Sequence, residues 1–238
     1  MKKALLLFVL FVLGTASALD IVMDAQKDAY YAGLTGPDDG WVYIGVEAAD
    51  PAMTSLPDDE YDLSANCWLA WDSTYLYLYS EVWDETVQVN NSTTYNNDAI
   101  EFKIDPDPLM ETTAGVAGIR LTALGEDLAE VEAGVDNLVT GPGGGAPEID
   151  EAWEPVEGED YARTETLLGY NLEFRLPFDK IVRSDKFVDN NVNGLMGLAI
   201  NIMDNDSGTR DTVERWCAFM SDNVWNIPQY HGTITFLE

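Results

Sequence analysis

The segment Cys67–Asp84, "CWLAWDSTYLYLYSEVWD", decides the fold because it has the pattern of two β-strands joined by a tight turn. Asp72-Ser73-Thr74, between the two halves, has the composition of a short hairpin connection. In the second half, leucine, serine and valine alternate with tyrosine and tryptophan, so both faces of that strand are largely apolar. This pattern is typical of a central strand that is covered on both sides.

Other runs with strand character are bounded by Gly, Pro, Asn or Asp, and long helical periodicity is not found. These runs cover residues 98–105, 116–124, 169–178, 195–206 and 232–238. The sequence therefore predicts an all-β fold, an antiparallel β-sandwich of the jelly-roll or immunoglobulin-like kind. Residues 19–238 are expected to form a single domain, with loop insertions near 36–63 and 133–162 where no regular pattern is present.

The first 18 residues have the pattern of a secretory signal peptide. Lys2 and Lys3 precede an apolar run, and Ala16-Ser17-Ala18 matches the small residues at a cleavage site. The apolar run is shorter than the ~20 residues needed to span a bilayer. We therefore expect a secreted protein, periplasmic or extracellular, that is not held in a membrane after cleavage.

The chain is strongly acidic, with 43 Asp and Glu against 12 Lys and Arg and a formal net charge of −31. Nucleic-acid binding is disfavoured because phosphate recognition needs clustered basic residues. Such acidity suits solubility in a salty or calcium-rich exterior.

The cysteines Cys67 and Cys217 are the two of the chain, and export favours a disulfide between them. Two buried thiols are the alternative. Neither a CxxC spacing nor a histidine cluster is present, which argues against a zinc site.

Six motifs in a fixed order resemble carbohydrate-binding module family 9 of the DOMON-like superfamily. They are "VMDAQKDAYY", "LAWDSTYLYLYSEVWDE", "NNDAIEFKIDPD", "GYNLEFRLPF", "LAINIMDNDSGTR" and "GTITFLE". The resemblance covers nearly the whole chain after residue 18. It implies a β-sandwich without catalytic activity that binds an oligo- or polysaccharide, with structural calcium nearby, and that acts beside extracellular glycoside hydrolases in polysaccharide degradation.

The resemblance also implies a set of sugar-binding residues. Two aromatic side chains would hold the sugar ring between them, and acidic, basic and amide groups would bind its hydroxyls. An asparagine of the family falls on an aspartate here. The corresponding residues are Tyr95 and Trp225 for the aromatic pair, and Glu101, Arg120, Arg210 and Asp222 for the polar contacts.

Strand parity gives an independent reason to place Glu101 and Arg120 together. If Ile100 and Phe102 face the core, Glu101 faces outward, and the same alternation turns Arg120 outward on the next strand. Their alternative role is a surface ion pair worth less than ~1 kcal/mol. Tyr95 and Trp225 have the alternative of ordinary surface aromatics.

Other functions are less well supported by the residues. No nucleophile motif or phosphate-binding glycine loop is present, so we expect no enzymatic activity. Haem binding through His231 with Met196 or Met203, as in some DOMON-like domains, is one alternative. A surface protein that has kept the fold and lost the site is another.

Calcium is the cofactor that the acidic turns suggest, because it takes six to eight oxygen ligands. None of the turns matches an EF-hand loop. The candidate ligands are Asp105, Asp107, Asp204 and Asp206, and Asp24 and Asp28 lie close together near the start of the mature chain.

Overall fold

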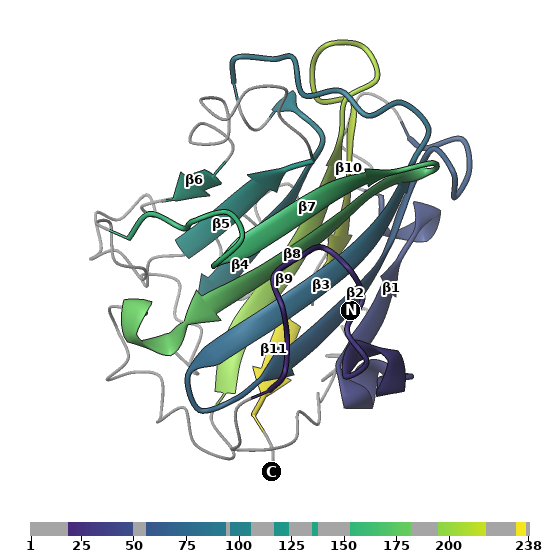
Figure 1. Cartoon of the computed structure of the whole chain (residues 1–238). Coiled ribbons are helices and arrows are strands. Elements are labelled where there is room, and N and C mark those ends of the chain that lie inside the picture. The colour runs from purple at the N-terminus through teal and green to yellow at the C-terminus, as the bar shows by residue number, and fades with distance from the viewer. Residues whose placement is uncertain are drawn as a thin grey trace, which may run out of the picture.

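The computed structural model describes residues 19–49, 56–93, 96–105, 117–123, 135–137, 153–181, 195–217 and 232–236. Within these ranges the chain forms two antiparallel β-sheets that lie face to face, with short 3-10 turns outside them (Figure 1). The fold is therefore the all-β sandwich that the sequence predicts. Among the residues described, no helix is long and apolar enough to cross a bilayer.

The first sheet is built around β3 (Tyr75–Asp84), the strand with two apolar faces, and has the order β1-β2-β3-β8-β7. Leu76 and Leu78 lie in the core between the sheets, whereas Tyr77 and Tyr79 are buried on the outer face. The other strands are β1 (Trp41–Ile44), β2 (Leu63–Trp71), β7 (Tyr161–Thr166) and β8 (Gly169–Pro177). The sequence correctly predicts a central strand covered on both sides.

The second sheet has the order β10-β9-β4-β5-β6. β11 pairs with Leu195–Leu198 of β9, and β10 pairs with Ile200–Asp204 of the same strand, so β9 has three partners. The strands are β4 (Ala99–Asp105), β5 (Ala117–Thr122), β6 (Val135–Asn137), β9 (Leu195–Asp204), β10 (Thr212–Trp216) and β11 (Gly232–Thr235).

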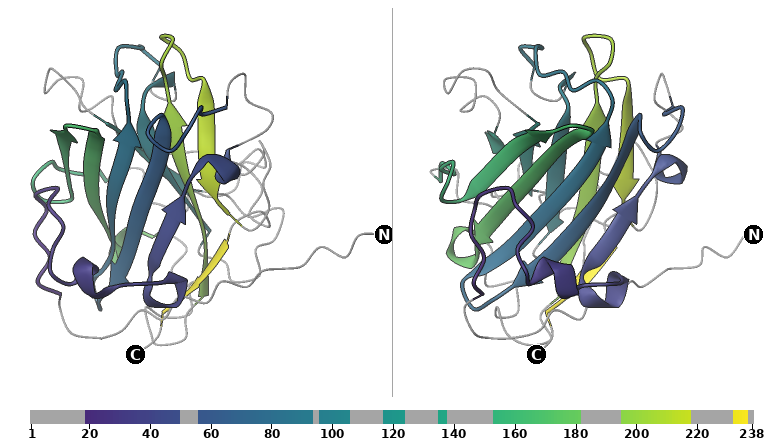
Figure 2. Two further views of the ribbon diagram at one scale, coloured as in Figure 1. Left: turned by 90° about the vertical axis from the view of Figure 1, so that its right-hand side faces the viewer. Right: turned by 45° about the vertical axis from the view of Figure 1, so that its right-hand side comes forward.

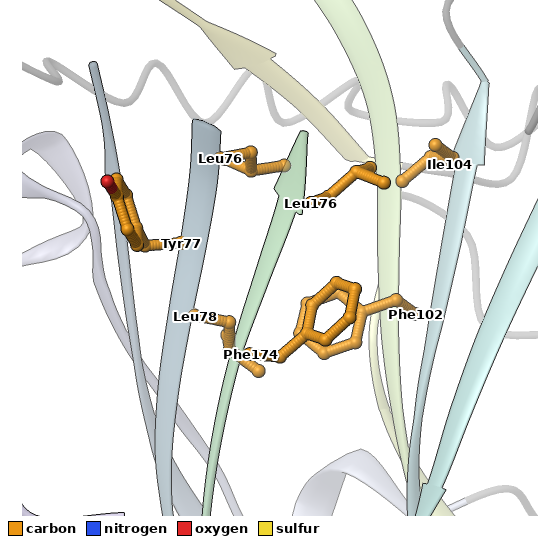
Figure 3. Close-up of a pocket in the computed structure, with 7 residues that line it drawn as sticks. All are labelled: Leu76, Tyr77, Leu78, Phe102, Ile104, Phe174 and Leu176. Atoms are coloured by element: carbon orange, nitrogen blue, oxygen red, sulfur yellow. The ribbon is translucent and has the colours of Figure 1, made fainter. Parts of the chain in front are cut away.

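Figure 2 shows the two sheets facing each other, and the core is formed by side chains from both sheets that lie between them. Phe102 of β4 and Phe174 of β8 meet there with ring centroids 6.0 Å apart. Figure 3 shows these rings beside leucine and isoleucine side chains from both sheets, while Tyr77 points away. The gap among them is about 10 Å³ and apolar, which suits a dry packing defect rather than a ligand site.

The segment before β1 lies across the outer face of the first sheet (Figure 1). The backbone N–H groups of Asp24 and Ala25 both donate to Oε2 of Glu173 on β8, at 3.2 Å each. The ring of Tyr31 stacks on Tyr79 at 5.5 Å. This segment buries half of a sheet face that would otherwise be open.

Both segments expected to be irregular contain strands. β1 lies within 36–63, and β6 and the start of β7 lie within 133–162. β1 is only four residues long between Gly40 and Gly45, and its pairing with β2 rather than its own pattern makes it a strand.

Candidate functional site

A row of polar residues crosses the outer face of the second sheet. The register pairs Glu101 of β4 with Asn201 of β9 on one side and with Arg120 of β5 on the other. It continues from Asn201 to Arg215 on β10, and from Arg120 to Asp136 on β6. Paired positions share one face of a sheet, so five polar residues follow one another across five strands.

Two neighbours hold Glu101 within this row. Its Oε2 accepts a hydrogen bond from Nδ2 of Asn201 at 2.7 Å, and its Oε1 lies 2.9 Å from Nζ of Lys103. The side chains of Glu101 and Lys103 are only 3% and 1% exposed. Ile100 and Phe102 face the core, as strand parity requires. The expectation of an open surface at Glu101 is wrong, because Lys103 stands two residues along the same face and pairs with it in a buried setting.

The other residues predicted from sequence are placed less completely. The backbone of Arg120 pairs with that of Glu101, but its side chain lies outside the description. Arg210 is half-buried in the turn after β9, beyond the strand end, whereas the row crosses β9 at Asn201. The remaining candidates, Tyr95, Asp222 and Trp225, lie outside the described residues.

Three members of the site were missed by sequence reasoning: Lys103, Asn201 and Arg215. All three are buried. The signal was present for Asn201, since it stands between Ile200 and Ile202, which both lie in the core, and so had to face outward. The pairing of β9 with both β4 and β10 was not readable, and that pairing brings the three residues together.

A second group of polar residues lies where three strands begin or end. Asp84 ends β3, Asp98 immediately precedes β4, and Asp204 ends β9. All three are buried, and one carboxylate oxygen from each lies within 4.8 Å of those from the other two. A more exposed group of Asp62, Glu85 and Asp206 meets the same distance limit.

The charges around the three buried aspartates oppose their ionisation. Burial, followed by the charge of Asp206, raises the pKa of Asp204 to about 8. Burial also raises the pKa of Asp98, with Asp84 as the next cause, and that of Asp84, with Asp206 as its strongest charged neighbour. Three carboxylates cannot stay ionised together in a buried site unless protons or a cation compensate them.

Several buried oxygens at this place lack a hydrogen-bond partner within the described structure. Oδ2 of Asp84 and Oδ1 of Asp204 are buried without a hydrogen-bond partner there, and so is the hydroxyl of Tyr170, which senses the charges of all three aspartates. Other oxygens are held by the backbone: Thr86 N–H donates to Asp84 at 2.8 Å and Asn205 N–H donates to Asp98 at 2.5 Å. Hard oxygen donors held in this way fit Ca²⁺.

The acidic turns named from sequence match this site in part. Asp204 belongs to the buried group and Asp206 to the exposed one. Asp105 ends β4, at the opposite end of the strand from Asp98, and its side chain lies outside the description. Asp107 lies outside the described residues.

The disulfide expected between Cys67 and Cys217 is not formed in the described structure. Cys67 is a buried thiol on the core side of β2, where its Sγ accepts a hydrogen bond from Ser80 Oγ at 3.3 Å. Cys217 follows β10 in the opposite sheet. Of the residues considered for haem, Met196 lies in the core and Met203 on the other face of β9, and His231 lies outside the described residues, so this alternative stays a prediction.

Solved structures with a similar β-sandwich are known. The fold is similar to that of a carbohydrate binding module family 9 from Caldicellulosiruptor kristjanssonii, solved in complex with cellotriose and in complex with glucose. Each likeness has a TM-score of 0.62 and 16% identity. The alignments cover 96% and 95% of this chain, and 93% and 95% of those chains. No curated protein gives a significant match.

The sequence itself matches a family profile described as "Carbohydrate family 9 binding domain-like" over residues 38–238. That range includes β1 and every later strand of both sheets. This chain therefore belongs to the carbohydrate family 9 binding domain-like family.

Proposed function

We propose that this protein binds the sugar rings of an oligo- or polysaccharide on the outer face of its second sheet, without catalysing a reaction. The observation that carries the proposal is the register that aligns Arg215, Asn201, Glu101 and Arg120 on neighbouring strands. Alternating donors and acceptors on a rigid sheet suit sugar hydroxyls, which both donate and accept hydrogen bonds. The sugar complexes of the similar structures support the same class of ligand.

Glu101 acts in this proposal as a fixed acceptor. An ionised carboxylate has about four acceptor positions. Nδ2 of Asn201 donates to Oε2 and Nζ of Lys103 lies against Oε1, so both carboxylate oxygens are held in place on the sheet. Lys103 forms an ion pair with Glu101, and charge-assisted hydrogen bonds from a carboxylate to the sugar are stronger than neutral ones.

In this proposal Arg215, rather than Arg210, is the arginine that binds the sugar beside Asn201. Arg215 is buried beside Asn201 in register, whereas Arg210 lies in the turn beyond the end of β9. Tyr95 and Trp225 are proposed as the aromatic walls, because an aromatic ring packs on the C–H face of a pyranose.

We further propose that Asp84, Asp98 and Asp204 hold a structural Ca²⁺. A bound Ca²⁺ would supply the positive charge that these buried carboxylates need. Export of the protein, and action beside extracellular glycoside hydrolases, complete the proposal.

The sugar site is tested by isothermal titration of the protein with glucose, cellobiose and xylobiose. Wild type is expected to bind at least one of them, and Glu101→Gln to bind at least ten-fold more weakly. Lys103→Met on the same face removes the charge that fixes Glu101 and should weaken binding as well. Far-UV circular dichroism and the Tm of each variant control for folding. Equal affinities of wild type and folded Glu101→Gln would contradict the proposed site.

The cation is tested by thermal unfolding with 1 mM Ca²⁺ or with EGTA. Calcium at a hundred times its Kd should add about 3 kcal/mol to the free energy of unfolding. Asp98→Asn and Asp204→Asn should lose this calcium-dependent gain, whereas the matched change Asp59→Asn at an exposed site should keep it. Identical unfolding curves of wild type in EGTA and in calcium would argue against a bound ion.

A further inference from the structure

The outer face of the first sheet is divided into a covered half and an accessible half. The segment before β1 covers Tyr77, Tyr79 and Glu173, which are all buried. Beyond it the register aligns Asn66 of β2 with Glu81 of β3, and Glu81 with Asn171 of β8. These three polar side chains are only half-buried. They form a polar row across the first sheet, on the side of the molecule opposite to Glu101.

Tryptophans lie on both sides of this polar row. Trp41 of β1 and Trp83 near the end of β3 are each half-buried on the same face. Strand spacing places their Cα atoms roughly 15 Å apart along the sheet. We call Trp41, Asn66, Glu81, Trp83 and Asn171 the outer groove.

Two hollows in the surface follow this arrangement and share Glu81 as a wall. One, of about 340 Å³, includes Trp41 and Asn66; the other, of about 260 Å³, includes Trp83 and Asn171. Sites for small ligands have volumes from about 300 Å³ upward. The two hollows together thus offer room for a ligand that extends across the sheet.

The charge of the outer groove differs from that of the rest of the molecule. Lys27 and Glu81 are the charged residues that line the two hollows within the described structure, and their Nζ and Oε1 atoms lie 3.7 Å apart. Lys27 also lies over the ring of Trp68, at 3.3 Å from its centroid. A nearly neutral groove on a chain with a net charge of −31 favours an uncharged polar ligand over a cationic one.

The amides of the groove are already oriented. Nε1 of Trp41 donates to Oδ1 of Asn66 at 3.0 Å, which leaves Nδ2 of Asn66 as a donor. Nδ2 of Asn171 donates to the carbonyl of Ala25 at 3.4 Å, which leaves Oδ1 of Asn171 as an acceptor. The polar row therefore presents a donor and an acceptor on either side of a carboxylate, between two aromatic side chains.

Exposed apolar side chains lie beside the outer groove, next to Trp83. Leu167 and Leu168, in the turn between β7 and β8, line the hollow beside Trp83 and are 96% and 52% exposed. Exposed leucines next to a tryptophan provide the apolar surface on which the C–H face of a sugar packs.

We infer that the outer groove is a second binding site, and that its ligand is a neutral oligosaccharide longer than one sugar ring. It takes its class of ligand from the proposed function but uses a different sheet, so each site can fail without the other. Two sites on opposite faces would let one chain contact two glycan strands and gain avidity.

The test is isothermal titration with cellotetraose and xylotetraose in two backgrounds, wild type and Glu101→Gln. In the Glu101→Gln background, Trp83→Ala and Asn66→Ala should each weaken the remaining binding at least ten-fold. Asn171→Ala, at the other side of Glu81, provides a second variant if Trp83→Ala does not fold. Tyr61→Ser, which removes an exposed aromatic outside the groove, should leave affinity unchanged.

The outcomes separate the two sites. Binding that survives Glu101→Gln and is lost in the groove variants supports the outer groove. If one ligand binds per chain and Glu101→Gln alone abolishes this binding, the outer groove is not a binding site. The site at Glu101 on the second sheet is then supported. If the groove variants lower the affinity and Glu101→Gln does not change it, the outer groove is supported and the proposed site at Glu101 is refuted. Absence of binding by wild type to either oligosaccharide refutes both.

Discussion

Replacing Glu173 with glutamine should remove part of the decrease in the free energy of unfolding that occurs between pH 5 and pH 8. Glu173 is fully buried under the segment before β1, where its Oε2 accepts two backbone hydrogen bonds. Its Oε1 is buried with no hydrogen-bond partner in the described structure. Burial, against the two hydrogen bonds that favour the ionised form, raises its pKa to about 8.

The sign follows from which state binds the proton more tightly. The native pKa of about 8 is above the ordinary value of 4.5 that applies to the unfolded chain. The native state therefore holds a proton that the unfolded state loses between these values. The contribution of Glu173 to stability is fully present below pH 4.5 and is lost as pH rises through 8. Each pH unit in this window costs roughly 1.4 kcal/mol.

Between pH 5 and pH 8 the loss from Glu173 alone amounts to roughly 3 kcal/mol. Glutamine keeps the carbonyl oxygen that accepts from Asp24 and Ala25 and cannot ionise. Relative to wild type, Glu173→Gln should therefore gain about 3 kcal/mol between the two pH values, or roughly 10 °C in Tm.

The assay is urea unfolding followed by tryptophan fluorescence at pH 5 and pH 8, with excess calcium throughout. The difference between the two proteins isolates Glu173, because any other buried carboxylate titrates equally in both. Glu165→Gln, an exposed change on β7, should run parallel to wild type. If Glu173→Gln also ran parallel to wild type, Glu173 would be ionised in the native state and the reasoning would be refuted.

Three further predictions, one on thiol reactivity and two on substitutions, test the fold. In a Cys217→Ser background, Cys67 should react with a thiol reagent such as DTNB only after unfolding, because burial raises its pKa to about 12; fast reaction of that native variant would contradict this. Gly169→Ala should cost 2 kcal/mol or more, roughly, in urea unfolding, since φ is +138° and the new Cβ would lie 2.2 Å from the carbonyl oxygen of Val82. Phe174→Ala should cost about 3–5 kcal/mol by the same measurement, and a loss under 1 kcal/mol would show that the ring does not fill the core between the sheets.

The sandwich was predictable because its signals are local. The alternation in Tyr75–Asp84 reveals a strand with two apolar faces, and the alternation around Glu101 gives the correct side for that residue. Strand pairs carry the rest of the information. Nothing local shows that Lys103 and Asn201 meet the two oxygens of Glu101, or that Glu101 is thereby buried.

The acidic site shows the same limit. Sequence reasoning groups acids that are close in the chain, such as Asp204 and Asp206. The buried group instead combines the end of β3, the start of β4 and the end of β9, which only the packing of two sheets brings together. The cysteine pair fails for the same reason, because export and an even count say nothing of which sheet each strand joins.

Three buried carboxylate sites also show how a chain with 43 acidic and 12 basic residues satisfies interior charge. Oε1 of Glu101 lies 2.9 Å from Nζ of Lys103, so a buried base offsets the charge of this carboxylate. Glu173 has two N–H donors and a raised pKa, so its charge depends on pH. The carboxylates of Asp84, Asp98 and Asp204 lie close to one another. A single base or a few N–H donors would not offset three negative charges. The third arrangement brings three carboxylates together in a buried site, where protons or a bound cation must compensate their charges.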